Sequence, residues 1–297
     1  MKLGRLAVAG SVMGLGAYWL ARFLQPEHSA LVLNNSVVLI TGASGGIGRA
    51  FALAFARQGA RIVLAARRAD VLDAVRQEIE PYAADMLVVP VDITDDGQVE
   101  ALVEAALERF GQIDILLNNA GLGLDGQVHT YDVQAIRQLV DVNLASAMCL
   151  TRLCLPGMLA RRAGWIVNVT SVGGRVHSPF QPVYGASRAG MLAFADGLRR
   201  QLEGTGVEVV SVLPAYTYSR MIRPSTERWA KRMGITFDTP DYVAARTIEG
   251  LLRGEQEIVF GGLTMRALIW LERHFPALMT LALRAVVTPE MIAAHDQ

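Results

Sequence analysis

Short apolar segments alternate with longer stretches of mixed polarity between about residue 37 and residue 260 of the 297-residue chain. The apolar segments are rich in β-branched residues and are apolar throughout, which is typical of strands covered on both faces. They predict strands at 37–41, 61–65, 86–91, 113–117, 165–170, 207–213 and 257–260. The stretches between them predict helices at 49–58, 69–80, 95–110, 131–161, 183–203 and 241–253.

This alternation predicts an α/β fold with a single doubly wound, Rossmann-type parallel sheet and helices on both faces. Consecutive parallel strands need a crossover connection, and a helix that makes the crossover packs back onto the sheet with a right-handed turn. Turn-forming residues stand at the joins, namely Gly59, Pro81, Gly111 and Gly164. The pattern shows no internal repeat and no boundary of a second domain. We therefore expect one catalytic domain over residues 29–262.

The first 28 residues have a different character. Residues 6–24 form an apolar run with a single charge, Arg22, and this length is barely enough to span a bilayer. Tyr18 and Trp19 suit a membrane interface. A cleaved signal peptide and a soluble apolar helix are the alternatives. Cleavage is disfavoured because bulky residues and Arg22 stand where a signal peptide has small residues at its cleavage site. We predict that residues 1–28 form a membrane anchor.

The tail, residues 263–297, is again apolar, with the scattered charges Arg266, Glu272, Arg273 and Arg284 over its first 25 residues. This pattern predicts an amphipathic helix. Three roles remain open for it: lying on a membrane, capping the core, or lining a subunit interface.

Charge and cysteine content narrow the function classes. The formal net charge is zero, so nothing electrostatic favours nucleic acid as a partner. Lys2 and Lys231 are the only lysines among 28 basic residues, which makes any one arginine weak evidence. Cys149 and Cys154 fall about 140° apart around a helix axis and cannot readily pair. Unpaired cysteines favour a reducing compartment, and no metal site is predicted.

A glycine-rich turn follows the first predicted strand. Gly42, Gly46 and Gly48 have the spacing G-x-x-x-G-x-G and lie between a strand and a helix. Glycines let the backbone turn tightly and approach a pyrophosphate, and the helix N-terminus attracts its charge. Since no Gly-Lys-Ser/Thr follows, the turn is not a nucleoside-triphosphate loop. The motif predicts a dinucleotide site.

The end of the second strand predicts which dinucleotide binds. Folds that bind NAD have an acidic residue here to hold the ribose 2′-hydroxyl, whereas this chain has Ala66 followed by Arg67 and Arg68. A guanidinium binds phosphate in a bidentate manner, which favours the 2′-phosphate of NADP. The alternative is that both arginines are solvated turn residues.

Further motifs follow in order along the chain. Asp92 follows the third strand, where its carboxylate would accept from an adenine amino group or cap a helix. Asn118-Asn119-Ala120-Gly121 ends the fourth strand, and Asn143, Ser171, Tyr184 and Arg188 come later. With these motifs, residues 35–262 resemble the short-chain dehydrogenase/reductase family. The resemblance implies a cofactor site made by Gly42, Ser44, Gly45, Gly46, Ile47, Gly48, Arg67, Asp92, Ile93, Asn119, Tyr184, Arg188 and Thr217.

The resemblance also implies the catalytic groups. Tyr184 would be the general acid in carbonyl reduction and the base in alcohol oxidation. An unperturbed tyrosine has a pKa of about 10, and a cation one helical turn away, as Arg188 is, stabilises the phenolate. Ser171 would bind the substrate oxygen, and Asn143 would position a water in the proton relay. An ordinary helix-packing amide is the alternative for Asn143.

Two positions depart from the family pattern. Arg188 stands where the family has lysine; arginine keeps the charge but is not deprotonated in proteins and fills more space. Ala215 follows Pro214 where glycine is common, and its methyl group adds bulk near the nicotinamide. The main hypothesis is an NADP-dependent oxidoreductase acting on a lipophilic ketone, aldehyde or secondary alcohol. The alternative is a cofactor-binding protein with weak or lost catalysis.

Residues 215–239 would form a lid over the substrate, and their aromatic and methionine side chains suggest an apolar ligand, although any closed lid packs apolar groups. Homo-oligomers are common in the family that the chain resembles, so the resemblance implies a homo-oligomer here.

Lys2 and Arg5 favour a cytoplasmic N-terminus, which would place the catalytic domain on the opposite side of the membrane. Because a reductase needs its cofactor pool, we expect a cytoplasmic domain instead, with an anchor that is inverted or lies on the membrane.

Overall fold

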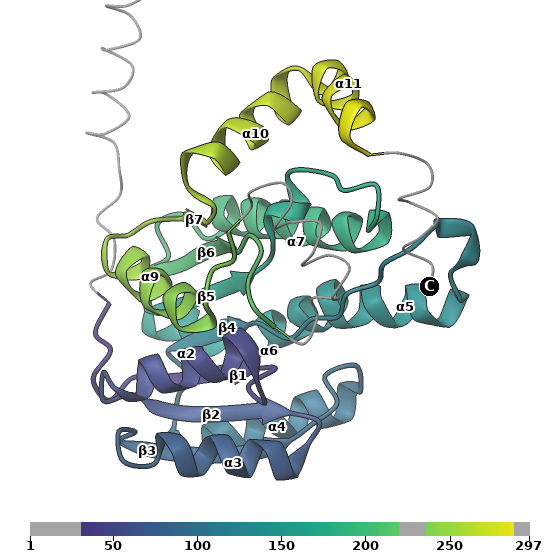
Figure 1. The fold of residues 1–297 in the computed structure, drawn as a ribbon. Coiled ribbons are helices and arrows are strands. Elements are labelled where there is room, and N and C mark those ends of the chain that lie inside the picture. Colours follow the sequence, from purple (N-terminus) through teal and green to yellow (C-terminus); the bar gives the residue numbers. More distant parts are fainter. Residues whose placement is uncertain (1–30, 220–235, 288–297) are drawn as a thin grey trace, which may run out of the picture.

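The structure, a computed structural model, describes residues 31–219 and 236–287. The predicted anchor and most of the predicted lid lie outside the described residues. The described chain contains one seven-stranded sheet in the order β3-β2-β1-β4-β5-β6-β7 (Figure 1). All six pairings are parallel. The strands are β1 Val37–Thr41, β2 Arg61–Ala66, β3 Asp85–Pro90, β4 Ile115–Asn118, β5 Gly164–Val169, β6 Val207–Leu213 and β7 Glu257–Val259.

The centre of the sheet positions the site. Val38 in β1 lies between Ile62 of β2 and Ile115 of β4. The chain moves outward from β1 to β3 and then returns to the other side of β1 at β4, so the crossovers diverge between these two strands. A crevice forms at such a point, beyond the carboxyl ends of the strands, and it is where ligands bind in open α/β sheets.

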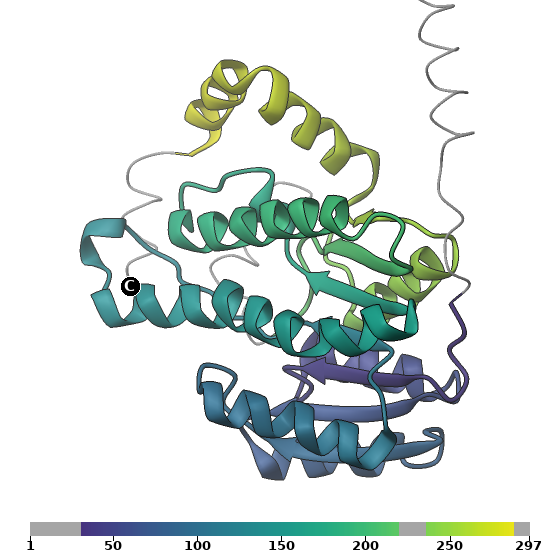
Figure 2. The ribbon, with the colours of Figure 1, turned by 180° about the vertical axis from the view of Figure 1, so that it is seen from behind.

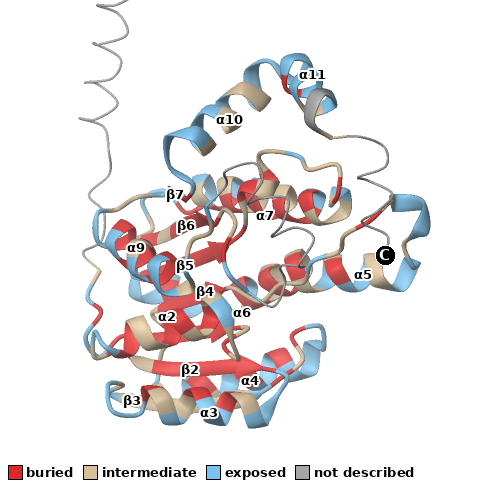
Figure 3. Ribbon diagram, in the orientation of Figure 1, coloured by how far each residue is buried: buried red, intermediate tan, exposed pale blue. Residues whose placement is uncertain are grey.

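Helices cover both faces of the sheet, which confirms the predicted doubly wound fold. The helices α2 (Gly46–Ala56), α3 (Ala69–Ile79) and α9 (Pro240–Leu252) lie on the face seen in Figure 1. The helices α4 (Asp96–Phe110), α6 (Ser146–Arg161) and α7 (Pro182–Gln201) cover the opposite face, seen in Figure 2. Each layer encloses its own apolar core, and Figure 3 shows the buried residues concentrated in the sheet and on the inner sides of these helices.

The predicted helix 131–161 is not one regular helix. It begins as α5 (Val133–Val140), widens into a π-helical turn at Asp141–Ala145, and continues as α6. Among the residues the structure describes, Val133–Arg161 alone is long and apolar enough to cross a membrane by length and composition. Here it is part of the fold, because α6 packs against α4, β4 and β5.

The tail also differs from its prediction, since it forms two helices: α10 (Gly262–His274) and α11 (Pro276–Val286). Pro276 has no N–H to continue α10, but proline suits the first turn of a new helix. The pair lies apart from both helix layers (Figure 1) and is largely exposed (Figure 3). Its exposed large apolar side chains are Leu263, Trp270, Phe275, Leu278 and Leu281. Most other predicted element ends differ from the observed ones by only one or two residues.

Candidate functional site

A cavity of about 1050 Å³ opens at the carboxyl edge of the sheet. Its walls come from the turns that follow β1, β2, β3, β4, β5 and β6, and from α10 and α11. Every residue predicted to bind the cofactor lines it: Gly42, Ser44, Gly45, Gly46, Ile47, Gly48, Arg67, Asp92, Ile93, Asn119, Tyr184, Arg188 and Thr217. Segments far apart in the sequence therefore meet around one space.

The glycine-rich turn has the shape of a phosphate cradle. A Cβ on Gly42 would stand 2.8 Å from the Ala120 Cα, and a Cβ on Gly48 would overlap the Gly42 carbonyl oxygen. A Cβ on Gly45, in contrast, would meet nothing within 4 Å. Gly45 is also the N-cap of α2, and no side chain caps this helix, whose first turn has no acidic residue. The open N-terminus of α2 therefore fits a diphosphate.

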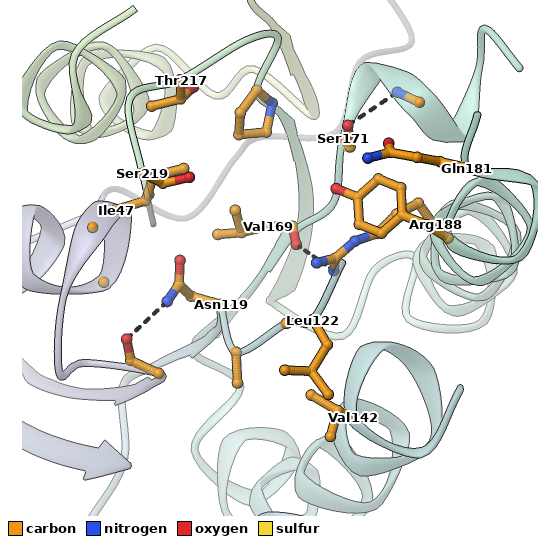
Figure 4. Close-up of a pocket in the computed structure, with 18 of the residues that line it drawn as sticks. Ile47, Asn119, Leu122, Val142, Val169, Ser171, Gln181, Arg188, Thr217 and Ser219 are labelled. Atoms are coloured by element: carbon orange, nitrogen blue, oxygen red, sulfur yellow. Dashed lines mark hydrogen bonds between the residues drawn. The ribbon is translucent and has the colours of Figure 1, made fainter. Parts of the chain in front are cut away.

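Thr41 joins the turn after β1 to the turn after β4. Its buried Oγ1 accepts from the backbone N–H groups of Asn119 (3.0 Å) and Ala120 (3.1 Å). The Asn119 amide donates back to the Thr41 carbonyl at 2.8 Å. Asn119 thus lines the cavity while its amide nitrogen holds the two turns together (Figure 4).

At the far end of the cavity, Ala66, Arg67 and Arg68 line the wall beyond β2. Nearby, Arg49 of α2 and Glu78 of α3 form a bidentate ion pair that joins the two helices, with Nε and Oε2 2.6 Å apart. This end of the cavity therefore combines a small residue at the strand end with two arginines that follow it.

Asp92 does not cap a helix. The N-cap of α4 is Asp95, whose carboxylate accepts from the Gln98 N–H at 3.0 Å. One Asp92 oxygen, Oδ1, accepts from the N–H and the hydroxyl of Thr94. The helix-cap alternative for Asp92 is therefore wrong, and the residue lies on the cavity wall beside Ile93.

Arg188 lies beneath Tyr184 in a closely fitted space. Its side chain is buried, its Nη1 donates to the Val169 carbonyl at 3.2 Å, and its Cζ is 5.1 Å from the centroid of the Tyr184 ring (Figure 4). A Cβ on Gly121 would overlap Nη2, so glycine at this position makes room for the guanidinium. The Arg188 Nε is buried and has no hydrogen-bond partner in the part of the chain that the structure describes.

Ser171 and Tyr184 meet across Gly173. The Ser171 Oγ accepts from the Gly173 N–H at 3.0 Å and starts the short 3-10 helix Val172–Gly174. A Cβ on Gly173 would stand 3.4 Å from the Ser171 Oγ and 3.5 Å from the Tyr184 Cε1. Both side chains line the cavity, so a hydroxyl and a phenol are available to one ligand atom.

Asn143 lies one layer behind the cavity wall. Its Oδ1 accepts from the Leu122 N–H at 2.7 Å, and its Nδ2 donates to the Leu122 carbonyl and the Ser187 hydroxyl. The Ser187 hydroxyl in turn donates to the Tyr184 carbonyl at 2.7 Å. In this structure the amide ties the loop after β4 to α7; its role in a proton relay stays a prediction.

Several residues of the ligand side were missed in the sequence. Gln181 and Asp125 both line the cavity, and the Gln181 amide donates to the Asp125 carboxylate. Tyr216, an aromatic residue of the predicted lid and therefore not among those missed, lies on the same wall, and burial together with the Asp125 charge raises the pKa of its phenol. The position of Gln181, three residues before Tyr184, was the one available signal. The apolar wall from α10 and α11 includes Met265, Leu268, Met279 and Leu283.

Cys149 and Cys154 are both free. Burial raises the pKa of the Cys154 thiol to about 12. Over residues 31–219 and 236–287, no cluster of three or more His, Cys, Asp or Glu side chains is arranged to hold a metal ion.

Comparison with known proteins places these features in a family. The family model for short chain dehydrogenases matches residues 36–229. A dehydrogenase/reductase SDR family protein 7-like of Anopheles gambiae is 31% identical over 283 residues, which cover 92% of this chain and 88% of that protein. Ketoacyl reductase HetN of a Nostoc strain is 34% identical over 228 residues, covering 76% and 79%.

A solved structure has the same fold. The crystal structure of a short chain dehydrogenase/reductase from Burkholderia phymatum, in complex with NAD, is 26% identical, with a TM-score of 0.76. The match covers 87% of this chain and 99% of that one. With the cradle, the cavity and the Ser171–Tyr184 pair on one sheet edge, the chain belongs to the short-chain dehydrogenase family and is a nicotinamide-dependent oxidoreductase.

Proposed function

We propose that the protein is an NADP-dependent reductase of lipophilic ketones or aldehydes, able to run in reverse on secondary alcohols. The observation that carries this proposal is the continuity of the cavity. One space of about 1050 Å³ runs from the glycine cradle, past Ser171 and Tyr184, to the apolar side chains of α10 and α11. A bound nicotinamide would supply the hydride.

The cradle residues fit the cofactor. The open N-terminus of α2 would hold the negative diphosphate. Ala66 leaves space where an acidic residue would repel a 2′-phosphate, and Arg67 supplies a guanidinium for it. The buried, unpaired Arg188 Nε matches a ribose hydroxyl, because a buried donor without a partner costs stability until a ligand accepts from it.

The chain's residues then divide the work at the carbonyl. Ser171 donates to the substrate oxygen, and Tyr184 transfers a proton to that oxygen as negative charge develops on it. Arg188 stabilises the phenolate that remains, since its guanidinium lies against the ring. Asn143 fixes the loop after β4 against α7, which holds Tyr184 and Arg188 of α7 in position relative to that loop. The apolar wall holds an apolar substrate and excludes water.

The test is an NADPH oxidation assay with long-chain ketones and aldehydes, run on the unmutated protein and on Tyr184→Phe. We expect turnover by the unmutated protein and a loss of at least ~100-fold in Tyr184→Phe, the low end for general acid catalysis. NADPH affinity should change little, since the ring is retained. Tight NADPH binding without turnover of any carbonyl would instead support a cofactor-binding protein with weak or lost catalysis. Arg188, in place of the family's lysine, is the feature that suggests this alternative.

We propose further that the protein is held at a membrane by residues 1–28, with the catalytic domain in the cytoplasm. The apolar run at residues 6–24 and the exposed apolar side chains of α10 and α11 support this proposal. Protease treatment of sealed vesicles tests it: the domain should be cleaved without detergent. Removal of residues 1–25 should shift the active protein to the soluble fraction.

A further inference from the structure

Gln181 begins α7 but does not use its side chain to cap it. The N–H of Gly185 donates to the Gln181 carbonyl at 2.9 Å, as in an ordinary first turn, and the side chain makes no capping hydrogen bond. Its Nε2 donates instead to the Asp125 carboxylate across the cavity wall. The side chain is therefore directed at the ligand space and held there from the loop after β4.

Asp125 is itself held in place. The N–H of the next residue, Gly126, donates to the Phe180 carbonyl at 3.0 Å, and the Tyr131 hydroxyl donates to the Gly126 carbonyl at 2.7 Å. These bonds join the loop after β4 to the segment that precedes α7. The distance between Asp125 and Gln181 is thus set by the backbone as well as by their own hydrogen bond.

This pairing fixes which way the amide faces. An ionised carboxylate only accepts hydrogen bonds, so Nε2 and not Oε1 of Gln181 must face Asp125. The second N–H and Oε1 remain for the cavity, and Figure 4 shows the Gln181 amide pointing toward Ser171. Gln181 is the N-cap of α7 and precedes Tyr184 by three residues, and both side chains line the cavity. The amide therefore lies at the reacting end of the cavity.

We infer that Gln181 contacts the substrate and selects carbonyl compounds that carry a hydroxyl group on the carbon next to the carbonyl. This inference rests on the proposed function and narrows its substrate class. A hydroxyl group donates to Oε1 and accepts from the free N–H, so it satisfies both. A methyl group in the same place would displace water from the amide without offering it a hydrogen bond, which costs affinity. Asp125 acts through Gln181 as a positioning residue.

The kinetic test uses two matched ketones with NADPH: 1-hydroxy-2-decanone, and 3-undecanone, in which a methyl group replaces the hydroxyl. We expect the unmutated protein to prefer the hydroxyketone by at least ~10-fold in kcat/KM, because a site built around a hydroxyl discriminates against its absence. In Gln181→Met the preference should fall to within about threefold, chiefly through a higher KM for the hydroxyketone. Gln138→Met, on the exposed side of α5, is the matched control and should keep the preference.

Two variants of Asp125 separate orientation from simple damage. Asp125→Asn keeps an acceptor for the Gln181 Nε2 and should retain most of the preference. Asp125→Leu removes the acceptor and frees the amide to rotate, so the preference should fall toward that of Gln181→Met. Loss of activity on both ketones in equal proportion in Asp125→Leu and Gln181→Met would show a structural role only and would overturn the inference.

A binding measurement tests the role of Gln181 even if the protein turns over neither ketone. Calorimetry with NADPH present compares 1,2-decanediol with 3-undecanol, the alcohols that correspond to the two ketones. We expect the diol to bind at least ~10-fold more tightly in the unmutated protein and not in Gln181→Met. Absence of turnover with both ketones would count against the proposed function, whereas equal affinity for the two alcohols in the unmutated protein would overturn the role of Gln181.

Discussion

Arg188 has contacts that a lysine would not reproduce. Its guanidinium is shared between the Val169 carbonyl, the face of the Tyr184 ring and the space left by Gly121. A compact ammonium at the same position would carry the charge but would not fill this space. The cation is thus built into the packing beneath Tyr184.

The Arg188 variants test this arrangement. Arg188→Lys should keep or raise turnover, since the charge is retained and a smaller head restores the family's relay. Arg188→Met should weaken NADPH binding and lower kcat together, because the phenolate loses its cation and the ribose its donor. Steady-state kinetics and fluorescence titration with NADPH measure both. Turnover by Arg188→Met at the unmutated rate would show that the guanidinium has no part in the chemistry.

The two cysteines should differ sharply in reactivity. Only a thiolate attacks alkylating reagents, and burial raises the pKa of Cys154 to about 12. Because a raised thiol pKa keeps the proton on sulfur, Cys154 stays neutral throughout pH 7–9 in the folded protein. Iodoacetamide labelling followed by peptide mass spectrometry should therefore find Cys154 unmodified until the protein is denatured. Labelling of Cys154 in the native protein at the rate of a free thiol would contradict its placement in the core.

At the scale of elements, the α10–α11 pair presents two different apolar sides. The inner side lines the cavity, where Met279 is 4% exposed, and the outer side carries Leu281, which is 65% exposed. The sequence of the tail left its role open among a membrane, the core and a subunit interface. The structure shows that the inner side completes the ligand cavity, whereas the outer side is exposed.

A matched pair of variants on α11 tests the inner side. Met279→Gln should lower kcat/KM for a long-chain ketone by about 5- to 15-fold, because burying an apolar side chain contributes about 1.5–3 kcal/mol and part of that is lost. Leu281→Gln, on the outer side of the same helix, should leave kcat/KM unchanged when residues 1–25 are removed. NADPH affinity serves as the control in both. A similar fall in the two variants would mean that α11 acts through its stability and not through ligand contact.

The sheet and its helices followed from the sequence because the central strands β1, β4 and β5 are buried on both faces and are therefore largely apolar. The π-helical turn at Asp141–Ala145 did not, and its central residue Asn143 forms hydrogen bonds with Leu122 and Ser187, which are distant in the sequence. In the candidate site, the glycine-rich turn could be recognised from the spacing of its glycines. Gln181 could not be recognised as a site residue, because its orientation depends on Asp125, which is 56 residues away in the chain.

At the scale of the whole molecule, we expect cofactor choice to be set where Ala66, Arg67 and Arg68 line the cavity. With Ala66 at the strand end and Arg67 after it, we expect NADPH to bind more tightly than NADH, and Arg67→Ala to remove most of the difference. Fluorescence titration gives both dissociation constants. Arg57→Ala, at the C-cap of α2, is a control of the same residue type outside the main cavity. Equal affinity for the two cofactors in the unmutated protein would refute the assignment of NADP.

The cavity draws its walls from the ends of six strands, β1 to β6, which make up nearly the whole sheet. A partly unfolded form that has lost any one of them has also lost part of the ligand's contacts, so the cofactor binds the fully assembled sheet and little else. Saturation at 100 times the dissociation constant then stabilises the native state by about 2.7 kcal/mol. That gain is shared by distant segments, and the cellular cofactor level thereby becomes a determinant of how long the protein survives proteolysis.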